Sequence, residues 1–277
     1  MTTPSPLGLI AGEGTFPLLV ARGARAAGRP VVCAALAGNA SPDLAAECQR
    51  FKWVGILRLG QWIRFLRSQG CTEAIMVGRA RKAEMYQAFR FFRYIPDLRT
   101  LRLYVTEIRH DKRDHALLLA VNNELAREGI TLIDSTKYCS DQLATPGVMT
   151  QRSPTDKQQA DIEFGWEMCR TVSRLDIGQA IAILDKDVLA VEAIEGTNAM
   201  IDRASLFCKT AGWTLIKCAN AQQDMRMDVP TVGTTTIEKL KQARAGCLVL
   251  EAGKTIILEK QKVLELADRY KIAVVGK

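Results

Sequence analysis

The chain has 277 residues, enough for two domains and for a core that needs neither a disulfide nor a structural metal. Its 38 basic residues exceed its 30 acidic residues, and the formal charge of +8 favours anionic partners such as phosphorylated substrates or an acidic membrane surface. Two histidines exclude a three-histidine metal site and disfavour a Ser-His-Asp triad, so we expect any hydrolysis to use carboxylates and a metal.

The compartment and the partners follow from what the composition lacks. Eight cysteines are scattered singly, so we expect buried thiols in a reducing compartment and no structural disulfide. The first residues do not form a signal peptide, and no run of about 18 apolar residues occurs, which predicts a soluble, cytoplasmic protein. No recognised nucleic-acid motif accompanies the positive charge, so we expect no nucleic-acid partner.

The first half alternates short apolar runs with helical patterns. The run LGLIA, a helical stretch over 16–27 and the run PVVCAAL predict a β-α-β opening. Later strands are predicted at FKWVGIL, EAIMVGR and ITLID, with helices at LGQWIRFLRSQG and HALLLAVNNELAREG. We therefore predict an α/β fold whose N-terminal domain, 1–135, is Rossmann-like with a parallel sheet.

The periodicity stops after Ser135, and the Pro, Gly, Ser and Thr of 136–160 are typical of a linker region. A C-terminal mixed α/β catalytic domain is predicted over 161–277. Its expected elements are a helix over 156–174, a hairpin turning at Asp185 to Asp187, a helix after Thr197, the strand WTLIKCA, and one more helix and strand.

A glycine turn follows the first predicted strand. Gly12 and Gly14 precede Thr15, which can cap the next helix, so several backbone N–H groups could bind phosphate or a nucleotide. A third glycine of the dinucleotide fingerprint would fall at Pro17, and no acid ends the second strand, which disfavours a dehydrogenase. A turn without ligand is an equal alternative.

A second strand-to-helix junction carries polar residues. Glu192 interrupts an apolar strand, and Glu195, Gly196 and Thr197 lead into a helix, so this junction could hold both a metal and a phosphate. The alternative is that the glutamates only complement the helix dipole.

Lys217 lies on the apolar strand WTLIKCA, where an ammonium needs a carboxylate or phosphate partner unless it faces solvent at an edge. Gly233 and the threonines through Thr236 begin another helix that could receive a phosphate, or simply be capped.

The stretch QQDMRMDVPTVGTTTI, residues 222–237, has the most informative spacing. In an extended segment Asp224, Arg226 and Asp228 would share one face, opposite Met225 and Met227. Two carboxylates suit Mg²⁺, and the guanidinium suits a phosphate, whereas the alternative is an edge strand with a solvated salt bridge.

An Arg-rich, aromatic segment, Tyr86 to Arg109, interrupts the first domain. Its composition favours a subunit interface, with contact to an anionic membrane surface as the second interpretation.

Four strings together resemble one family over nearly the whole chain: GLIAGEGTFPLLVA, SPTDKQQADIEFGWEMCRTVSRLDIGQA, LAVEAIEGTNAMIDRA and QDMRMDVPTVGTTTI. They are similar to the UDP-2,3-diacylglucosamine pyrophosphatases of lipid A biosynthesis, of the metal-dependent type with two α/β domains. The resemblance implies a substrate held between the domains and a homodimer. It also implies Mg²⁺-dependent attack of water on the α-phosphate, giving UMP and 2,3-diacylglucosamine 1-phosphate. A lipid substrate suggests a peripheral position at the inner membrane.

The resemblance also assigns residues. The acidic motif falls on Gln223, Asp224, Arg226 and Asp228, the E-G-T-D motif on Glu195, Gly196 and Thr197, and the basic strand position on Lys217. Its fourth E-G-T-D position is Asn198 here, an amide that brings no charge to a metal. We hypothesise that Asp228 is the leading catalytic acid, as metal ligand or base. Asp224 and Glu192 or Glu195 would complete the metal site, and Arg226 and Lys217 would neutralise the diphosphate.

Two alternatives stay open on the residues alone. The residues expected to bind phosphate do not show whether the substrate carries acyl chains, so another nucleotide-linked sugar could be the substrate. The protein could also be a non-catalytic regulator that binds a nucleotide or a lipid. Asn198 is the sequence feature that favours this alternative.

Overall fold

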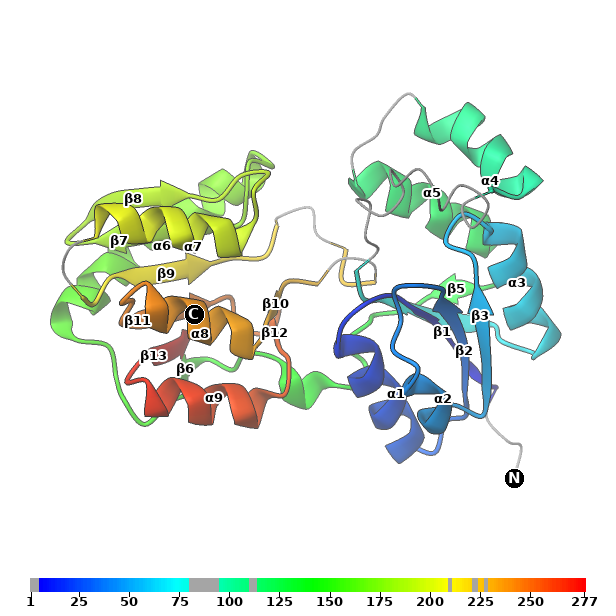
Figure 1. Cartoon of the computed structure of the whole chain (residues 1–277), viewed down its shortest axis with the longest axis horizontal. Coiled ribbons are helices and arrows are strands. Elements are labelled where there is room, and N and C mark those ends of the chain that lie inside the picture. The colour runs from blue at the N-terminus through cyan, green and yellow to red at the C-terminus, as the bar shows by residue number, and fades with distance from the viewer. Residues whose placement is uncertain (1–4, 80–94, 110–113, 209–210, 221–223, 227–228) are drawn as a thin grey trace. The chain divides into compact units, whose positions relative to one another are not determined.

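The computed structural model describes residues 5–79, 95–109, 114–208, 211–220, 224–226 and 229–277 (Figure 1). The chain forms two compact units. The first contains Met1–Cys139 and Met225–Met227, and the second contains Ser140–Asp224 and Asp228–Lys277. Both units are α/β, with a parallel sheet in the first and a mixed sheet in the second, which confirms the predicted fold class.

The sheet of the first unit has five parallel strands in the order β3-β2-β1-β4-β5. These strands are β1 (Leu7–Ala11), β2 (Val31–Leu36), β3 (Arg50–Val54), β4 (Glu73–Val77) and β5 (Thr131–Leu132). Every residue of β1 and β2 is buried, so both faces of the sheet centre are covered. This explains why the two strands are continuous apolar runs without alternation.

Helices connect these strands, and those at 16–26, 59–68 and 114–127 agree with the periodicity, whereas the short helices at 44–47 and 98–103 were not predicted. They are α1 (Phe16–Ala26), α2 (Leu44–Glu47), α3 (Leu59–Ser68), α4 (Leu98–Leu103) and α5 (Asp114–Arg127). Phe16, Val20 and Ala24 recur at every fourth position of α1 and are all buried, as expected of an amphipathic helix on a sheet. α4 continues into a π-helical turn, Tyr104–Ile108; the preceding part of the Arg-rich segment, 86–94, lies outside the described residues.

The second unit has a six-stranded sheet in the order β6-β13-β11-β9-β7-β8. The strands are β6 (Gly147–Val148), β7 (Ala180–Leu184), β8 (Asp187–Val191), β9 (Thr214–Lys217), β11 (Cys247–Leu250) and β13 (Ala273–Gly276). β9, β11 and β13 are parallel, whereas β6, β7 and β8 each run antiparallel to a neighbour. A separate parallel pair joins β10 (Thr231–Val232) to β12 (Ile256–Ile257).

Each face of this sheet packs against helices. α6 (Asp156–Arg174) places Ile162, Trp166 and Cys169 in one core, with side chains of β7, β9 and β11. α7 (Thr197–Phe207), α8 (Thr234–Gln242) and α9 (Lys260–Arg269) contribute to a second core around Trp213 and Leu248. The predicted hairpin and the helices at 156–174 and after Thr197 are confirmed.

Three expectations differ from the structure. Residues 136–160, expected to link the domains, divide between the units, because β6 pairs with β13 and α6 begins at Asp156. The chain after the acidic motif holds two helix-and-strand sets rather than one, α8 with β11 and α9 with β13. Thr15 is the N-cap residue of α1, but its side chain makes no capping hydrogen bond.

All eight cysteines are free thiols, seven of them buried and Cys48 partly exposed. Among the described residues, no helix combines the length and the apolar character needed to cross a bilayer.

Candidate functional site

A cluster of three side chains, two of them buried, lies where β8 and β9 end and α7 begins. Lys217 is the last residue of β9 and pairs in register with Ala180 of β7, whose carbonyl accepts the backbone N–H of Glu192 at 2.8 Å. Glu192 and Lys217 therefore flank the same end of β7. Both residues are only 5% exposed, and burial of two charged groups requires that each find a partner.

Thr197, the first residue of α7, supplies that partner. Its hydroxyl accepts a hydrogen bond from Lys217 Nζ at 2.7 Å and donates one to Glu192 Oε1 at 2.9 Å. An ammonium, a hydroxyl and a carboxylate thus form one chain of hydrogen bonds. The helix is preceded by Gly196, whose φ of +81° an L side chain rarely adopts. Gly196 is the N-cap residue of α7, and the Thr197 hydroxyl serves the cluster.

Glu192 keeps one oxygen available. Its Oε2 is buried and has no hydrogen-bond partner among the described residues. A buried carboxylate oxygen without a partner costs free energy unless a cation or a donor approaches it. Glu192 therefore fits the role of a ligand for a metal or of an acceptor for substrate.

Glu195 has a different environment, although only three residues separate it from Glu192. Its Oε1 pairs with Arg203 Nη2 at 2.6 Å, and its Oε2 accepts the N–H of Ala193. Hydrogen bonds from its own backbone N–H and from Arg203 lower the pKa of Glu195 from its usual value. Of the two glutamates, Glu192 is the one whose oxygen remains available. Asn198 follows Thr197 on α7 and is exposed.

Two polar residues at this edge of the sheet were missed by the sequence reasoning. The side-chain Oε1 of Gln179 is buried and has no hydrogen-bond partner in the described part of the chain, and the Gln179 carbonyl accepts the N–H of Cys218, next to Lys217. Glu251 follows β11 directly; its N–H donates to the Lys217 carbonyl, and its Oε2 accepts the N–H of Ala219 at 2.8 Å. An acid straight after the apolar run CLVL was the available signal for Glu251.

The acidic motif is described only in part. Asp224 and Arg226 are half-buried, whereas Gln223 and Asp228 lie outside the described residues. Met225 and Arg226 lie in a turn, so the expected extended segment with Asp224 and Arg226 on one face is wrong. The Met225 carbonyl accepts hydrogen bonds from the N–H and the hydroxyl of Ser135, at 3.1 and 2.6 Å, which hold the backbone in this turn.

The glycine turn packs against the end of β4. Gly12 N–H donates to the Val77 carbonyl, and Glu13 exchanges two backbone hydrogen bonds with Arg79. A Cβ on Gly12 would lie 2.6 Å from the Arg79 carbonyl oxygen, so this position requires glycine. Two of the N–H groups expected to receive an anion are thus used within the fold. Gly14, with φ +106°, and Thr15 are exposed beyond them.

The last predicted phosphate position is the start of α8. Gly233 is the N-cap residue, and as a glycine it provides no side-chain cap. Thr236 donates its N–H to the Gly233 carbonyl at 3.0 Å.

A metal ion at this site would be held by carboxylate side chains. Among the described residues, no three or more His, Cys, Asp or Glu side chains are grouped so that they could hold a metal ion. The available oxygen of Glu192 fits a carboxylate ligand, and further ligands would have to come from elsewhere in the chain.

Comparison with known proteins gives matches over nearly the whole chain. The model of the LpxI N-terminal domain matches residues 6–142, and that of the LpxI C-terminal domain matches residues 145–275. A protein of Caulobacter vibrioides named UDP-2,3-diacylglucosamine pyrophosphatase LpxI is 31% identical over 280 residues, which cover 98% of this chain and 96% of that protein.

Proposed function

The chain belongs to the LpxI family, and on that premise we propose that it hydrolyses the diphosphate of UDP-2,3-diacylglucosamine in lipid A biosynthesis. The observation that supports this most is the chain of hydrogen bonds from the buried Lys217 through Thr197 to the buried Glu192. It places a cation and an available carboxylate oxygen at the end of the strands, where α/β sheets bind ligands.

The proposed reaction is attack of water on the α-phosphorus. A bond forms between the water oxygen and that phosphorus, and the bond from the phosphorus to the bridging oxygen breaks. The bridging oxygen leaves on the sugar phosphate, so the products are UMP and 2,3-diacylglucosamine 1-phosphate. One proton of the water passes to a base, for which we propose Asp228.

The cations have a separate role. Lys217 neutralises the negative charge of the diphosphate, and the Thr197 hydroxyl orients its ammonium. We propose that Arg226 also neutralises the diphosphate, by binding phosphoryl oxygens in a bidentate fork. The backbone N–H groups beyond Gly14 and at the start of α8 would receive the remaining phosphate or ribose oxygens.

We propose Mg²⁺ as the cofactor, held by Glu192 and Asp224, with Asp228 acting either as a third ligand or as the base. The available oxygen of Glu192 supports the first ligand, and the pairing of Glu195 with Arg203 disfavours Glu195. When bound, this ion would polarise the phosphoryl oxygen and lower the pKa of a coordinated water. Asn198, where the resemblance expects Asp, would then bring no charge to the site.

The test is UMP release from UDP-2,3-diacylglucosamine, measured with Mg²⁺ and with excess EDTA. We expect release only with Mg²⁺, and loss of release in Asp228→Ala but not in the control Asp187→Ala, which removes a carboxylate at the exposed start of β8. Absence of UMP with a folded protein would reject the hydrolase proposal. Full activity of Asp228→Ala would reject only the role of that residue.

We also propose a transient contact with the inner-membrane surface through the helix 98–108. Leu98, Leu101 and Val105 recur at helical spacing and are exposed, Leu98 at 86%. Arg99 on the opposite side pairs with Glu128 at 2.6 Å. An exposed apolar stripe beside Arg102 is the pattern of a helix that lies in a lipid interface.

Sedimentation with phosphatidylglycerol vesicles tests this contact. We expect Leu98→Gln to reduce binding and Leu175→Gln, the same change at an exposed leucine of the second unit, to leave it intact. Equal binding of both variants would reject this surface. We further propose a cytoplasmic homodimer, which light scattering of the purified protein would test.

A further inference from the structure

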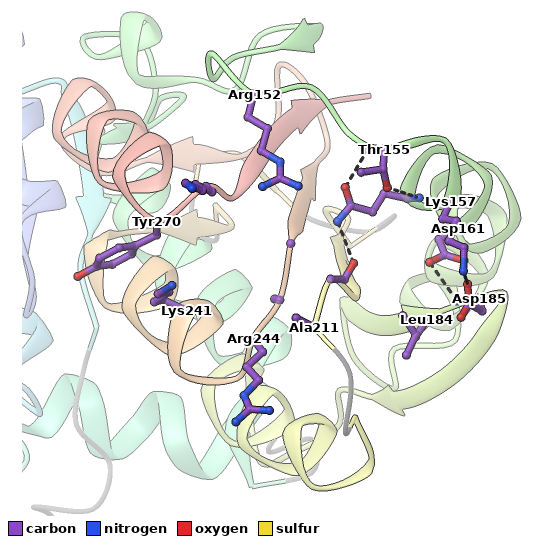
Figure 2. A pocket seen from close by; sticks show the side chains of 15 residues that line it. Arg152, Thr155, Lys157, Asp161, Leu184, Asp185, Ala211, Lys241, Arg244 and Tyr270 are labelled. Atoms are coloured by element: carbon purple, nitrogen blue, oxygen red, sulfur yellow. Dashed lines mark hydrogen bonds and ion pairs between the residues drawn. The ribbon is translucent and has the colours of Figure 1, made fainter.

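A cavity of about 580 Å³ lies in the second unit, at the edge of the sheet where its parallel strands begin (Figure 2). Gly212, Gly246 and Lys271, which line it, come shortly before the first residues of β9, β11 and β13. Lys217 is at the other end of β9. The cavity is therefore separate from the candidate active site.

The lining is strongly cationic. Five basic side chains contribute to it, against two carboxylates, those of Asp161 and Asp185. The basic residues are Arg152, Lys157, Lys241, Arg244 and Lys271.

Both carboxylates are already used within the fold. Asp161 is buried, and its two oxygens accept the backbone N–H groups of Asp185 and Lys186 at 3.2 and 2.7 Å. Asp185 pairs with Lys157 at 3.3 Å. The other four cations have no ion pair with a carboxylate in the part of the chain that the structure describes.

Helix dipoles explain only some of this charge. Lys241 and Arg244 lie at the C-terminal end of α8, and Lys271 lies just beyond α9, where cations complement the helix dipole. Arg152 is not at the C-terminal end of α8 or α9, so it does not complement either helix dipole. It comes from the connection between β6 and α6, and in Figure 2 its guanidinium extends into the space that these residues line.

We propose that this cavity is a second ligand site, which binds a phosphate group, either free or on a lipid headgroup. A concave surface with unpaired cations concentrates anions, and a guanidinium binds phosphate oxygens in a bidentate fork. The first turn of α6 also lines the cavity, and its dipole adds a positive contribution.

The test compares two double variants. Arg152→Gln with Lys271→Gln removes two charges from the cavity. Arg170→Gln with Lys262→Gln removes two charges from exposed positions outside its lining, on α6 and α9. Inorganic phosphate, titrated calorimetrically with excess UMP present, probes a free anion. Flotation with phosphatidylglycerol vesicles probes a headgroup.

We expect at least one probe to bind, with affinity reduced about tenfold or more in the cavity variant and unchanged in the control, since two charge-assisted hydrogen bonds are lost. The probe that binds identifies the source of the phosphate. Absence of binding by both probes, or equal binding by the two variants, would overturn the proposal. Both readouts measure binding rather than turnover, so the result is independent of the proposed hydrolysis.

Discussion

Lys217 and Glu192 are joined through a single oxygen atom, the hydroxyl of Thr197. The three residues come from the end of β9, the end of β8 and the start of α7. The hydroxyl donates its one proton to the carboxylate and offers a lone pair to the ammonium, so it serves both groups at once. One side chain thus contacts both charged groups.

Thr197→Val keeps the shape of the side chain and removes the hydroxyl. We expect a loss of about 1–3 kcal/mol of unfolding free energy, because two buried charged groups lose a partner. We also expect turnover to fall by about 10- to 100-fold, as when a group that orients a functional residue is removed. Denaturant titration and UMP release measure the two effects, and Thr197→Ser should restore both. Wild-type stability and turnover in the valine variant would contradict this role.

The two glutamates before α7 should respond differently to loss of charge. Glu192→Gln should abolish most metal-dependent turnover, because Oε2 is the oxygen available to a ligand. Glu195→Gln should retain most of it, because Arg203 already occupies Glu195. The measurement is the Mg²⁺ dependence of UMP release in each variant. A larger loss of turnover in Glu195→Gln than in Glu192→Gln would mean that Glu195, and not Glu192, is the metal ligand.

Gly12→Ala and Gly233→Ala form a matched pair among the predicted phosphate positions. An added Cβ meets backbone at 2.6 Å at Gly12, but finds no atom closer than 3.9 Å at Gly233. We expect about 1–3 kcal/mol of destabilisation for the first and a near-neutral effect for the second. Urea unfolding monitors both. Equal stability of the two variants would show that the β4 end moves away without cost.

Cysteine reactivity should follow burial and hydrogen bonding. A hydrogen bond from Cys33 lowers the pKa of the partly exposed Cys48, whereas burial raises the pKa of Cys71 to about 11 and that of Cys247 to about 12. Iodoacetamide near pH 8 should therefore modify Cys48 first, as read by mass spectrometry. Early modification of Cys247 in the folded protein would contradict the burial of that thiol.

The same raised pKa values predict a loss of stability in alkali. An unfolded thiol ionises near pH 8.5, whereas Cys247 in the folded protein ionises at about 12. The contribution of Cys247 is thus complete below about pH 8.5 and is lost as the pH rises toward 12. Denaturant midpoints between pH 8 and 10.5 should fall less steeply in Cys247→Ala than in the wild type. Parallel slopes would contradict the linkage.

The fold could largely be predicted because local patterns and tertiary structure agree. The apolar runs of β1 and β2 and the fourfold spacing in α1 indicated a covered parallel sheet without any knowledge of contacts. Glu192 and Lys217 were singled out because a charge within an apolar strand needs a partner. The identity of that partner, Thr197, depends on how α7 packs, which no local pattern contains.

Other parts depended on long-range contacts that spacing does not encode. The alternation of Asp224 and Arg226 suggested a strand, but the hydrogen bonds from Ser135 to Met225 bend the chain into a turn there. Gln179 and Glu251 reach the site through the register of β7, β9 and β11, which only the assembled sheet defines. Arg152 joins the cationic cavity for the same reason, since its neighbours in space are distant in the sequence.

The division of the chain also has a consequence for its synthesis. Most of the first unit, up to Cys139, leaves the ribosome early, but its remaining residues, Met225–Met227, are translated after most of the second unit. The hydrogen bonds from the backbone N–H and the hydroxyl of Ser135 to Met225 can therefore form only after Met225 has been synthesised. Folding during translation, which generally proceeds from the N-terminal domain, would leave the first unit incomplete until the acidic motif emerges. The segment proposed to hold the catalytic acid is thus also the one whose arrival completes the earlier half of the molecule.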